Sequence, residues 1–144
     1  KSFNQDLNWN VSSVTNMSYM FHNAESFNGD ISNWNVSSVT TMASMFRNAQ
    51  SFNQDISKWE VGNVTDMRYM FHEAKRFNRD ISDWNISNVT DMSSMFQNAV
   101  SFKKELEWNI NPATDTTNMY NNSGYVPRNN PIDSDYESSD DDEE

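Results

Sequence analysis

The sequence predicts an α/β repeat fold, in which about five coils of roughly 25 residues stack into a solenoid. Each coil is expected to contain a short strand followed by a short helix. Two observations lead to this prediction: bulky apolar residues recur at one fixed interval, and their spacing changes within each copy from irregular to helical. The first phenylalanine of each copy marks where the coils begin: Phe3, Phe27, Phe52, Phe77 and Phe102.

The repeat accounts for nearly all of the large apolar side chains. The five tryptophans form a single column: Trp9, Trp34, Trp59, Trp84 and Trp108. Two columns contain eight of the nine methionines, and Met119 falls in the second of them in a degraded fifth copy. The remaining phenylalanines form their own column: Phe21, Phe46, Phe71 and Phe96. Stacked copies would bury these columns in one core, at about 1.5–3 kcal/mol for each fully buried Met, Phe or Ile.

The second half of each copy predicts a short helix. Met67, Met70, Phe71 and Ala74 follow the i, i+3, i+4, i+7 spacing of one helical face. Thr65 precedes them and is a good N-cap, as are its counterparts Thr15, Thr40 and Thr90. A helix of about ten residues is too short to hold together alone in water. We therefore expect its Met/Phe stripe to pack on the rest of the coil.

The first half of each copy predicts a short strand. In "FNQDISKWEV", at positions 52–61, the apolar residues have extended, irregular spacing. We expect a strand from about Asp55 to Trp59, followed by a turn. One strand and one short helix in about 25 residues is the leucine-rich-repeat type of coil.

The shared pattern "FNQDIS-W-V--VT-MRYMF--A" resembles the BspA-like leucine-rich-repeat class. The similarity is to its 25-residue form, known as a domain of unknown function in mycoplasma surface lipoproteins. It covers residues 1 to about 120 and uses nine or more columns per copy. The resemblance implies a right-handed solenoid and, more loosely, surface display, adhesion or protein–protein binding on a cell or virion. It implies no catalytic residues.

Composition divides the chain into residues 1–120 (the repeats), a linker at 121–132 and an acidic tail at 133–144. The formal net charge is −11, and the tail contains eight acidic residues and no basic one, which leaves −3 for residues 1–132. Such a dense block of like charge predicts disorder. The chain has no cysteine and no apolar run of membrane-spanning length, and the cysteine-free composition fits a cytoplasmic protein as well as a surface protein.

Two further expectations concern the ends of the chain. The first copy is of full quality although terminal repeats are normally atypical, so we expect upstream coils and a targeting signal in a longer protein. In the tail, three serines each stand three residues before an acidic residue, which is typical of acidophilic-kinase substrates: Ser134, Ser138 and Ser139.

Several chemical readings of the columns are disfavoured. The acidic column offers one carboxylate per coil, whereas calcium needs six to eight oxygen ligands, so we expect it to bind backbone amides instead: Asp6, Asp30, Asp55, Asp80 and Glu105. A carbohydrate platform on the Trp column is less favoured than a core role. No catalytic triad, phosphate loop or metal motif is present, so the sequence predicts neither an enzyme nor a cofactor.

The residues that vary between copies indicate the function best, because the shared columns are committed to stacking. They predict a basic patch with one aromatic residue for a protein partner: Arg47, Arg68, Tyr69, His72, Arg76 and Arg79. The acidic net charge disfavours nucleic acid. The predicted function is therefore non-catalytic recognition or adhesion, and the alternative is a structural spacer or virion or cell-surface component. A further use of the patch is to bind the chain's own acidic tail.

Overall fold

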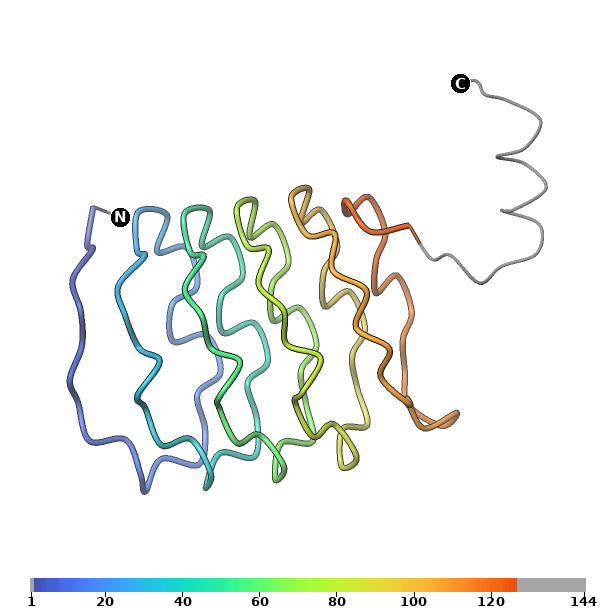
Figure 1. Ribbon diagram of the computed structural model, residues 1–144, viewed down its shortest axis with the longest axis horizontal. Coiled ribbons are helices and arrows are strands. Elements are labelled where there is room, and N and C mark those ends of the chain that lie inside the picture. The colour runs from blue at the N-terminus through green and yellow to red at the C-terminus, as the bar shows by residue number, and fades with distance from the viewer. Residues whose placement is uncertain (1, 127–144) are drawn as a thin grey trace.

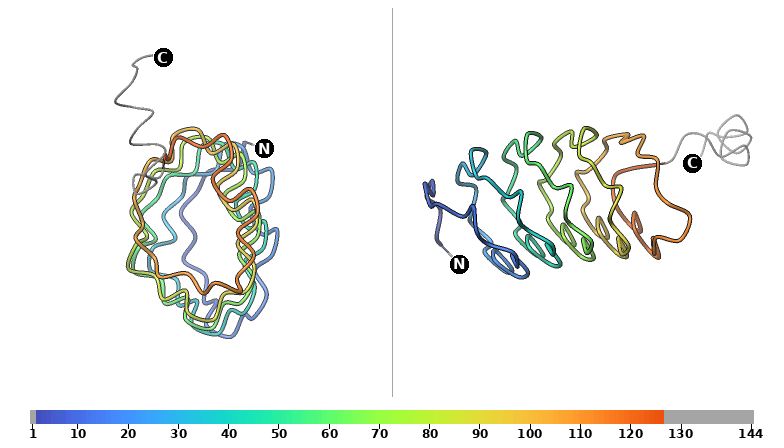
Figure 2. Two further views of the ribbon diagram at one scale, coloured as in Figure 1. Left: turned by 90° about the vertical axis from the view of Figure 1, so that its right-hand side faces the viewer. Right: turned by 90° about the horizontal axis from the view of Figure 1, so that it is seen from below.

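The computed structural model describes residues 2–126, which form a stack of five coils (Figure 1). Viewed along the stack, the coils superimpose around a common outline, and the side view shows them following one another at a constant tilt (Figure 2). The coils comprise residues 3–26, 27–51, 52–76, 77–101 and 102–126.

The coils contain neither of the two predicted elements. Residues 2–126 include no helix, and their β-pairing is limited to isolated parallel bridges between successive coils, at Asn16, Thr41, Asp66, Asp91 and Asp115. The predicted α/β solenoid of strand-plus-helix coils is therefore wrong, and with it the right-handed leucine-rich-repeat-like architecture expected from the resemblance.

Consecutive tight turns take the place of the predicted helix. The amides of Met70, His72 and Ala74 each donate to the carbonyl three residues earlier, at 3.0–3.2 Å. Tyr69 and Glu73 have positive φ values of 57° and 59°. These two residues occupy the third position of their turns, where a type II turn requires positive φ. Positive φ is incompatible with a right-handed helix, although the turns still direct Met67, Met70, Phe71 and Ala74 into the core.

The alternate amides donate to the next coil. Four such hydrogen bonds of 2.9–3.0 Å join coil three to coil four, from Met67 to Asp91, Tyr69 to Ser93, Phe71 to Met95 and Glu73 to Gln97. Because the coils stack at a fixed interval, these amides bond to carbonyl groups of the next coil. In a short helix they would have to bond to carbonyl groups of the same helix, which is unstable alone. We call this side, residues 16–23, 41–48, 66–73, 91–98 and 115–122, the ladder wall.

The opposite side replaces the predicted strand by turns and side-chain hydrogen bonds. The amide of Trp59 donates to the carbonyl of Ile56 at 3.1 Å, and the carboxylate of Asp55 accepts the amide of Ser57 at 2.9 Å. Asn carboxamides accept backbone amides of the next coil at 2.7–3.0 Å, along the column Asn4, Asn28, Asn53 and Asn78. We call this side, which contains Asn4, Asn28, Asn53 and Asn78, the Asn wall. The predicted binding of backbone amides by the acidic column is confirmed for Asp6, Asp30, Asp55 and Asp80.

The predicted core columns are confirmed. The Phe71 ring is fully buried and stacks on Phe46 at 5.5 Å, on Phe96 at 5.6 Å and on Phe77 at 4.0 Å between ring centroids. Each Trp from coil two onward donates its indole N–H to a carbonyl of the preceding coil, as Trp59 does to Ile31 at 3.1 Å. The core therefore consists of aromatic columns that run through successive coils.

The two ends of the stack differ. In coil one, Phe3, Trp9 and Met20 are exposed, although their counterparts in coil two are buried. In coil five, Tyr120 continues the Phe96 column, and the ring of Tyr125 packs on it at 4.4 Å. Residues 121–126 thus continue the packing of coil five, and the remainder of the predicted linker, like the tail at 133–144, lies outside the described residues.

Candidate functional site

Three of the predicted partner-binding residues meet on the ladder wall. The guanidinium carbon of Arg47 lies 4.7 Å from the ring centroid of Tyr69, as in a cation–π contact. The edge of that ring meets the imidazole of His72, with 5.4 Å between centroids and 82° between planes. We call these residues the Arg47–Tyr69–His72 cluster.

The backbone ladder fixes the positions of these side chains. The amide of Tyr69 donates to Ser93 in coil four, and the carbonyl of His72 accepts the amide of Asn48 in coil two at 2.7 Å. Coils two and three are therefore joined directly beneath the cluster. The column of Tyr69 holds tyrosine in coil one and serine in coils two and four. Tyr19 and His22 of coil one repeat the edge contact at 5.7 Å, so the Arg47 guanidinium over the ring is what distinguishes coil three.

His72 is the most enclosed ionisable group of the cluster. Its side chain is 11% exposed, and its Nδ1 atom is buried without a hydrogen-bond partner. Nε2 lies 3.9 Å from a carboxylate oxygen of Glu73. Burial lowers the pKa of His72; the Glu73 carboxylate opposes this effect, and the positive charge of Arg47 adds to it. Neutral imidazole is therefore the form that the folded protein prefers.

This preference predicts that acid destabilises the fold through His72. A group whose folded pKa lies below its unfolded pKa stabilises the protein above the unfolded value, about 6.5 for histidine, and this stability is lost as the pH falls through the folded pKa. The free energy of unfolding, measured with urea from pH 8 to pH 5, should therefore fall more steeply for the native chain than for His72→Gln. Parallel curves would contradict the prediction.

The other predicted residues lie apart from the cluster or beside it. Arg68 is exposed and forms an ion pair with Asp66, with 3.3 Å between Nε and Oδ2. Arg76 is exposed where coil three ends. The Nε of Arg79 donates to the carbonyl of Asn53 at 2.9 Å, so Arg79 belongs to the Asn wall.

Glu73 is a site residue that the sequence reasoning missed. In coils one, two and four its column holds Asn, which tolerates positive φ better than most residues do. The Asn side chains also bind one another across coils, as Asn48 Nδ2 does to Asn23 Oδ1 at 2.8 Å. The sequence shows that Glu73 is the exception in a column of Asn residues. Only the positive φ and the hydrogen bonds between the Asn carboxamides explain why Asn fits this position better.

Restoring the ladder should stabilise the protein. In Glu73→Asn, the new carboxamide can bond to Asn48 and accept from Asn98, and the strain of a positive φ decreases. We expect the free energy of unfolding to rise by about 1 kcal/mol. Glu73→Gln is the matched control, because it removes the same charge without the short Asn side chain. An equal gain in both variants would assign the effect to charge and contradict the ladder explanation.

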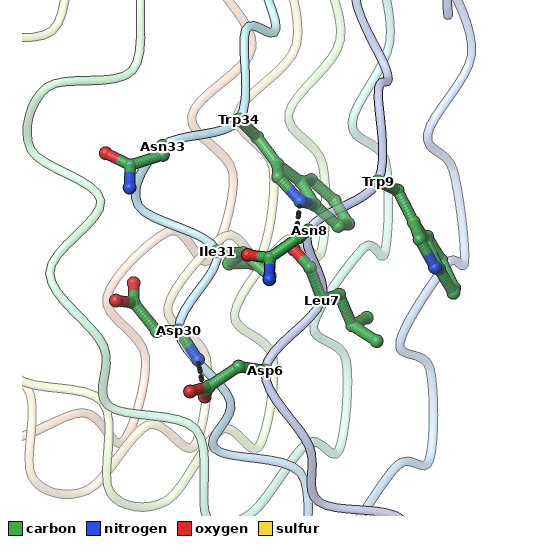
Figure 3. Close-up of a pocket in the computed structure, with 8 residues that line it drawn as sticks. All are labelled: Asp6, Leu7, Asn8, Trp9, Asp30, Ile31, Asn33 and Trp34. Atoms are coloured by element: carbon green, nitrogen blue, oxygen red, sulfur yellow. Dashed lines mark hydrogen bonds between the residues drawn. The ribbon is translucent and has the colours of Figure 1, made fainter.

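At the exposed end of the Trp column, the Trp9 ring and the neighbouring carboxylates lie on different sides of the chain (Figure 3). A hollow of about 300 Å³ lies between coils one and two, and Figure 3 shows its lining residues. The carboxylates of Asp6 and Asp30 lie on one side of the two chain segments, and the indole of Trp9 lies on the other (Figure 3). The exposed ring face and the polar groups therefore do not converge on one ligand position.

Two other kinds of feature are absent from the part of the chain that the structure describes. Residues 2–126 contain no cluster of three or more His, Cys, Asp or Glu side chains that could hold a metal ion. Within the same residues, no helix has the length and apolarity that a membrane span requires. The serines predicted to be phosphorylated, Ser134, Ser138 and Ser139, lie outside the described residues.

Comparison with known proteins supports the family part of the resemblance but not its leucine-rich-repeat part. Neither the curated proteins nor the solved structures give a match to the chain. One family matches over residues 1–62 and again over residues 33–133, so the two matches together span nearly all of the sequence. The chain belongs to the family described as Mycoplasma protein of unknown function, DUF285.

Proposed function

We propose that the chain is a non-catalytic recognition module that binds a protein partner through the Arg47–Tyr69–His72 cluster. The cluster itself is the observation that carries the proposal. Arg and Tyr are enriched at the hot spots of protein interfaces, and here they are in contact on one wall of the stack. Their columns contain Ser and Gln in coil four, so stacking alone does not require them.

The rigidity of the surface supports the same function. Ordering long side chains and loops is one of the costs of association. The ladder hydrogen bonds hold the turns of coils two and three together, and the Tyr69 ring supports the Arg47 guanidinium. A partner would therefore meet a surface that is largely ordered before binding.

The test exchanges the cluster for the residues that coil four already accepts. In the triple variant Arg47→Gln, Tyr69→Ser and His72→Gln, each new side chain matches Ser94 or Gln97, so the fold should be preserved. Partners would be identified by cross-linking in the native cells, and their affinities would then be measured with purified full chains. We expect a partner of the native chain to bind the variant at least about 30-fold more weakly, as the loss of a hot spot predicts.

A matched control changes an exposed cation elsewhere. Lys58 is exposed and lies outside the ladder wall, so Lys58→Ser should leave the affinity unchanged. If the native chain and the triple variant bind the same partners equally well, the recognition proposal fails.

The structural spacer remains the second candidate, because the aromatic columns and the ladder use most large side chains for stacking. Deleting the whole copy at residues 77–101 distinguishes the two. A spacer should lose function when its length changes, whereas recognition through coils two and three should persist.

A further inference from the structure

Positive charge is concentrated around the cluster, and much of it lacks a partner. The ion pairs formed within residues 2–126 are those of Arg68 with Asp66 and of His72 with Glu73. The positive groups of Arg47, Lys75 and Arg76 therefore have no ion-pair partner in this part of the chain. They lie on the ladder wall or at its end in coils two and three.

Arg47 is well prepared to bind a carboxylate. Its guanidinium lies over the Tyr69 ring, and a guanidinium offers five N–H donors and no acceptor. A planar guanidinium fits a carboxylate with two parallel hydrogen bonds, which a compact ammonium group cannot provide. The chemistry of this surface thus suits an acidic polypeptide segment.

The chain itself carries such a segment a few residues beyond coil five. Residues 133–144 contain eight acidic residues and no basic one. Asp133 follows Val126, the last described residue, by seven positions, which an extended chain spans over about 23 Å. Stacked Phe rings of successive coils are 5.5–5.6 Å apart. Coil five and coil two are three steps apart, which corresponds to a separation of about 17 Å along the stack, because each step is close to the spacing of neighbouring strands.

We propose that the acidic segment 133–144 binds the Arg47–Tyr69–His72 cluster, with Lys75 and Arg76, and thereby competes with the protein partner. The inference rests on the proposed function, because it describes the regulation of the same surface. Tethering supports the contact, since joining two groups through a short connection raises their effective concentration, to the millimolar range in favourable cases. Weak pairing between exposed charges is then sufficient to occupy the site in a reversible manner.

The test uses the full chain without any partner. Its tail is left intact or neutralised by changing all eight acidic residues of 133–144 to Asn or Gln, and His72 is titrated by NMR. A carboxylate beside His72 favours the imidazolium, so we expect the pKa of His72 to be about half a unit lower in the neutral-tail chain. The Nε–Hε signal of Arg47 should also shift between the two chains. An identical His72 pKa and an unmoved Arg47 signal would overturn the proposal.

Two controls establish the source of the effect. In 1 M salt, the native chain should acquire the His72 pKa of the neutral-tail chain, because screening removes exposed ion pairs; a difference that survives salt would overturn the proposal. A difference that grows with protein concentration would place the tail of one copy on another copy and would overturn the contact within one chain.

A second variant tests the surface. Combining Arg47→Gln with Lys75→Ser and Arg76→Ser should abolish the effect of tail neutralisation on His72. Persistence of the effect would place the tail elsewhere and overturn the proposal. Because no partner is present, these results are independent of whether the triple cluster variant loses its partner, so the two proposals can fail separately.

Discussion

Replacing Phe71 with alanine is expected to lower the free energy of unfolding by about 3–5 kcal/mol. Phe71 is fully buried, and it contacts the rings of Phe46, Phe77 and Phe96. Its loss leaves a cavity that interrupts an aromatic column in the middle of the stack. Because domains are stable by only about 5–15 kcal/mol in total, this single change should remove a large fraction of the stability. Urea unfolding followed by tryptophan fluorescence measures the effect.

The matched control makes the same change at the end of a column. Phe3 is 42% exposed and stacks on Phe27 alone, at 5.7 Å. We expect Phe3→Ala to cost about 1 kcal/mol or less, in the range of ordinary surface changes. If both substitutions lower the free energy of unfolding equally, burial inside a continuous column does not explain the effect of Phe71→Ala.

Gly29→Ala is expected to destabilise the protein by about 1–3 kcal/mol, as overpacking does. A Cβ atom at Gly29 would collide with the carbonyl oxygen of Gln5 and lie 2.8 Å from the Phe27 ring. Because the obstacle includes backbone of coil one, it cannot move aside as a flexible side chain can. The same unfolding measurement detects the loss.

Gly62→Ala provides the comparison. There the nearest atom to a new Cβ is the Asn85 carboxamide at 3.2 Å, which is a side chain and can adjust. We expect the free energy of unfolding to change by no more than about 0.5 kcal/mol. Equal costs at the two glycines would show that the close approach of coil one is not the cause.

Gly29 also shows where prediction from the sequence stops. The other coils have Gln5, Gln54, Arg79 and Lys104 in its column, so the repeat alone indicates a position that accepts long side chains. Gln5 is the residue of this column in coil one, and its backbone carbonyl lies where a Cβ at Gly29 would stand. This close approach depends on three-dimensional contacts that a column of letters does not contain.

The core could be predicted, but the backbone conformation could not. The spacing of Met67, Met70, Phe71 and Ala74 correctly indicated one buried face. A helix and a series of tight turns both return side chains to one side at this spacing, and periodicity does not distinguish them. The deciding factor is that alternate amides bond to the next coil, with Tyr69 and Glu73 at positive φ.

The candidate site was predictable in part for the same reason. Arg47, Tyr69 and His72 were identified as variable residues. The stack brings them into contact because Arg47 precedes His72 by one coil in the same column, and Tyr69 lies three residues before His72 on the same wall. Arg79 follows the turn onto the Asn wall, which the expected helix could not show. Glu73 becomes informative only when its φ value and its Asn neighbours are known.

Four of the five backbone hydrogen bonds that join each pair of coils at the ladder wall share one direction, and one at its edge runs the other way, as from Thr65 to Thr40. The majority gives this wall an electrical polarity. Between each pair of coils, four amide groups point toward the later coil and four carbonyl groups point toward the earlier one. Each peptide unit carries a dipole of about 3.5 D, and aligned units add head to tail. The edge of coil five on this wall is therefore its positive pole, where anionic groups are favoured, and the edge of coil one is its negative pole. Each coil inserted into the stack would lengthen this array of dipoles without changing its sense.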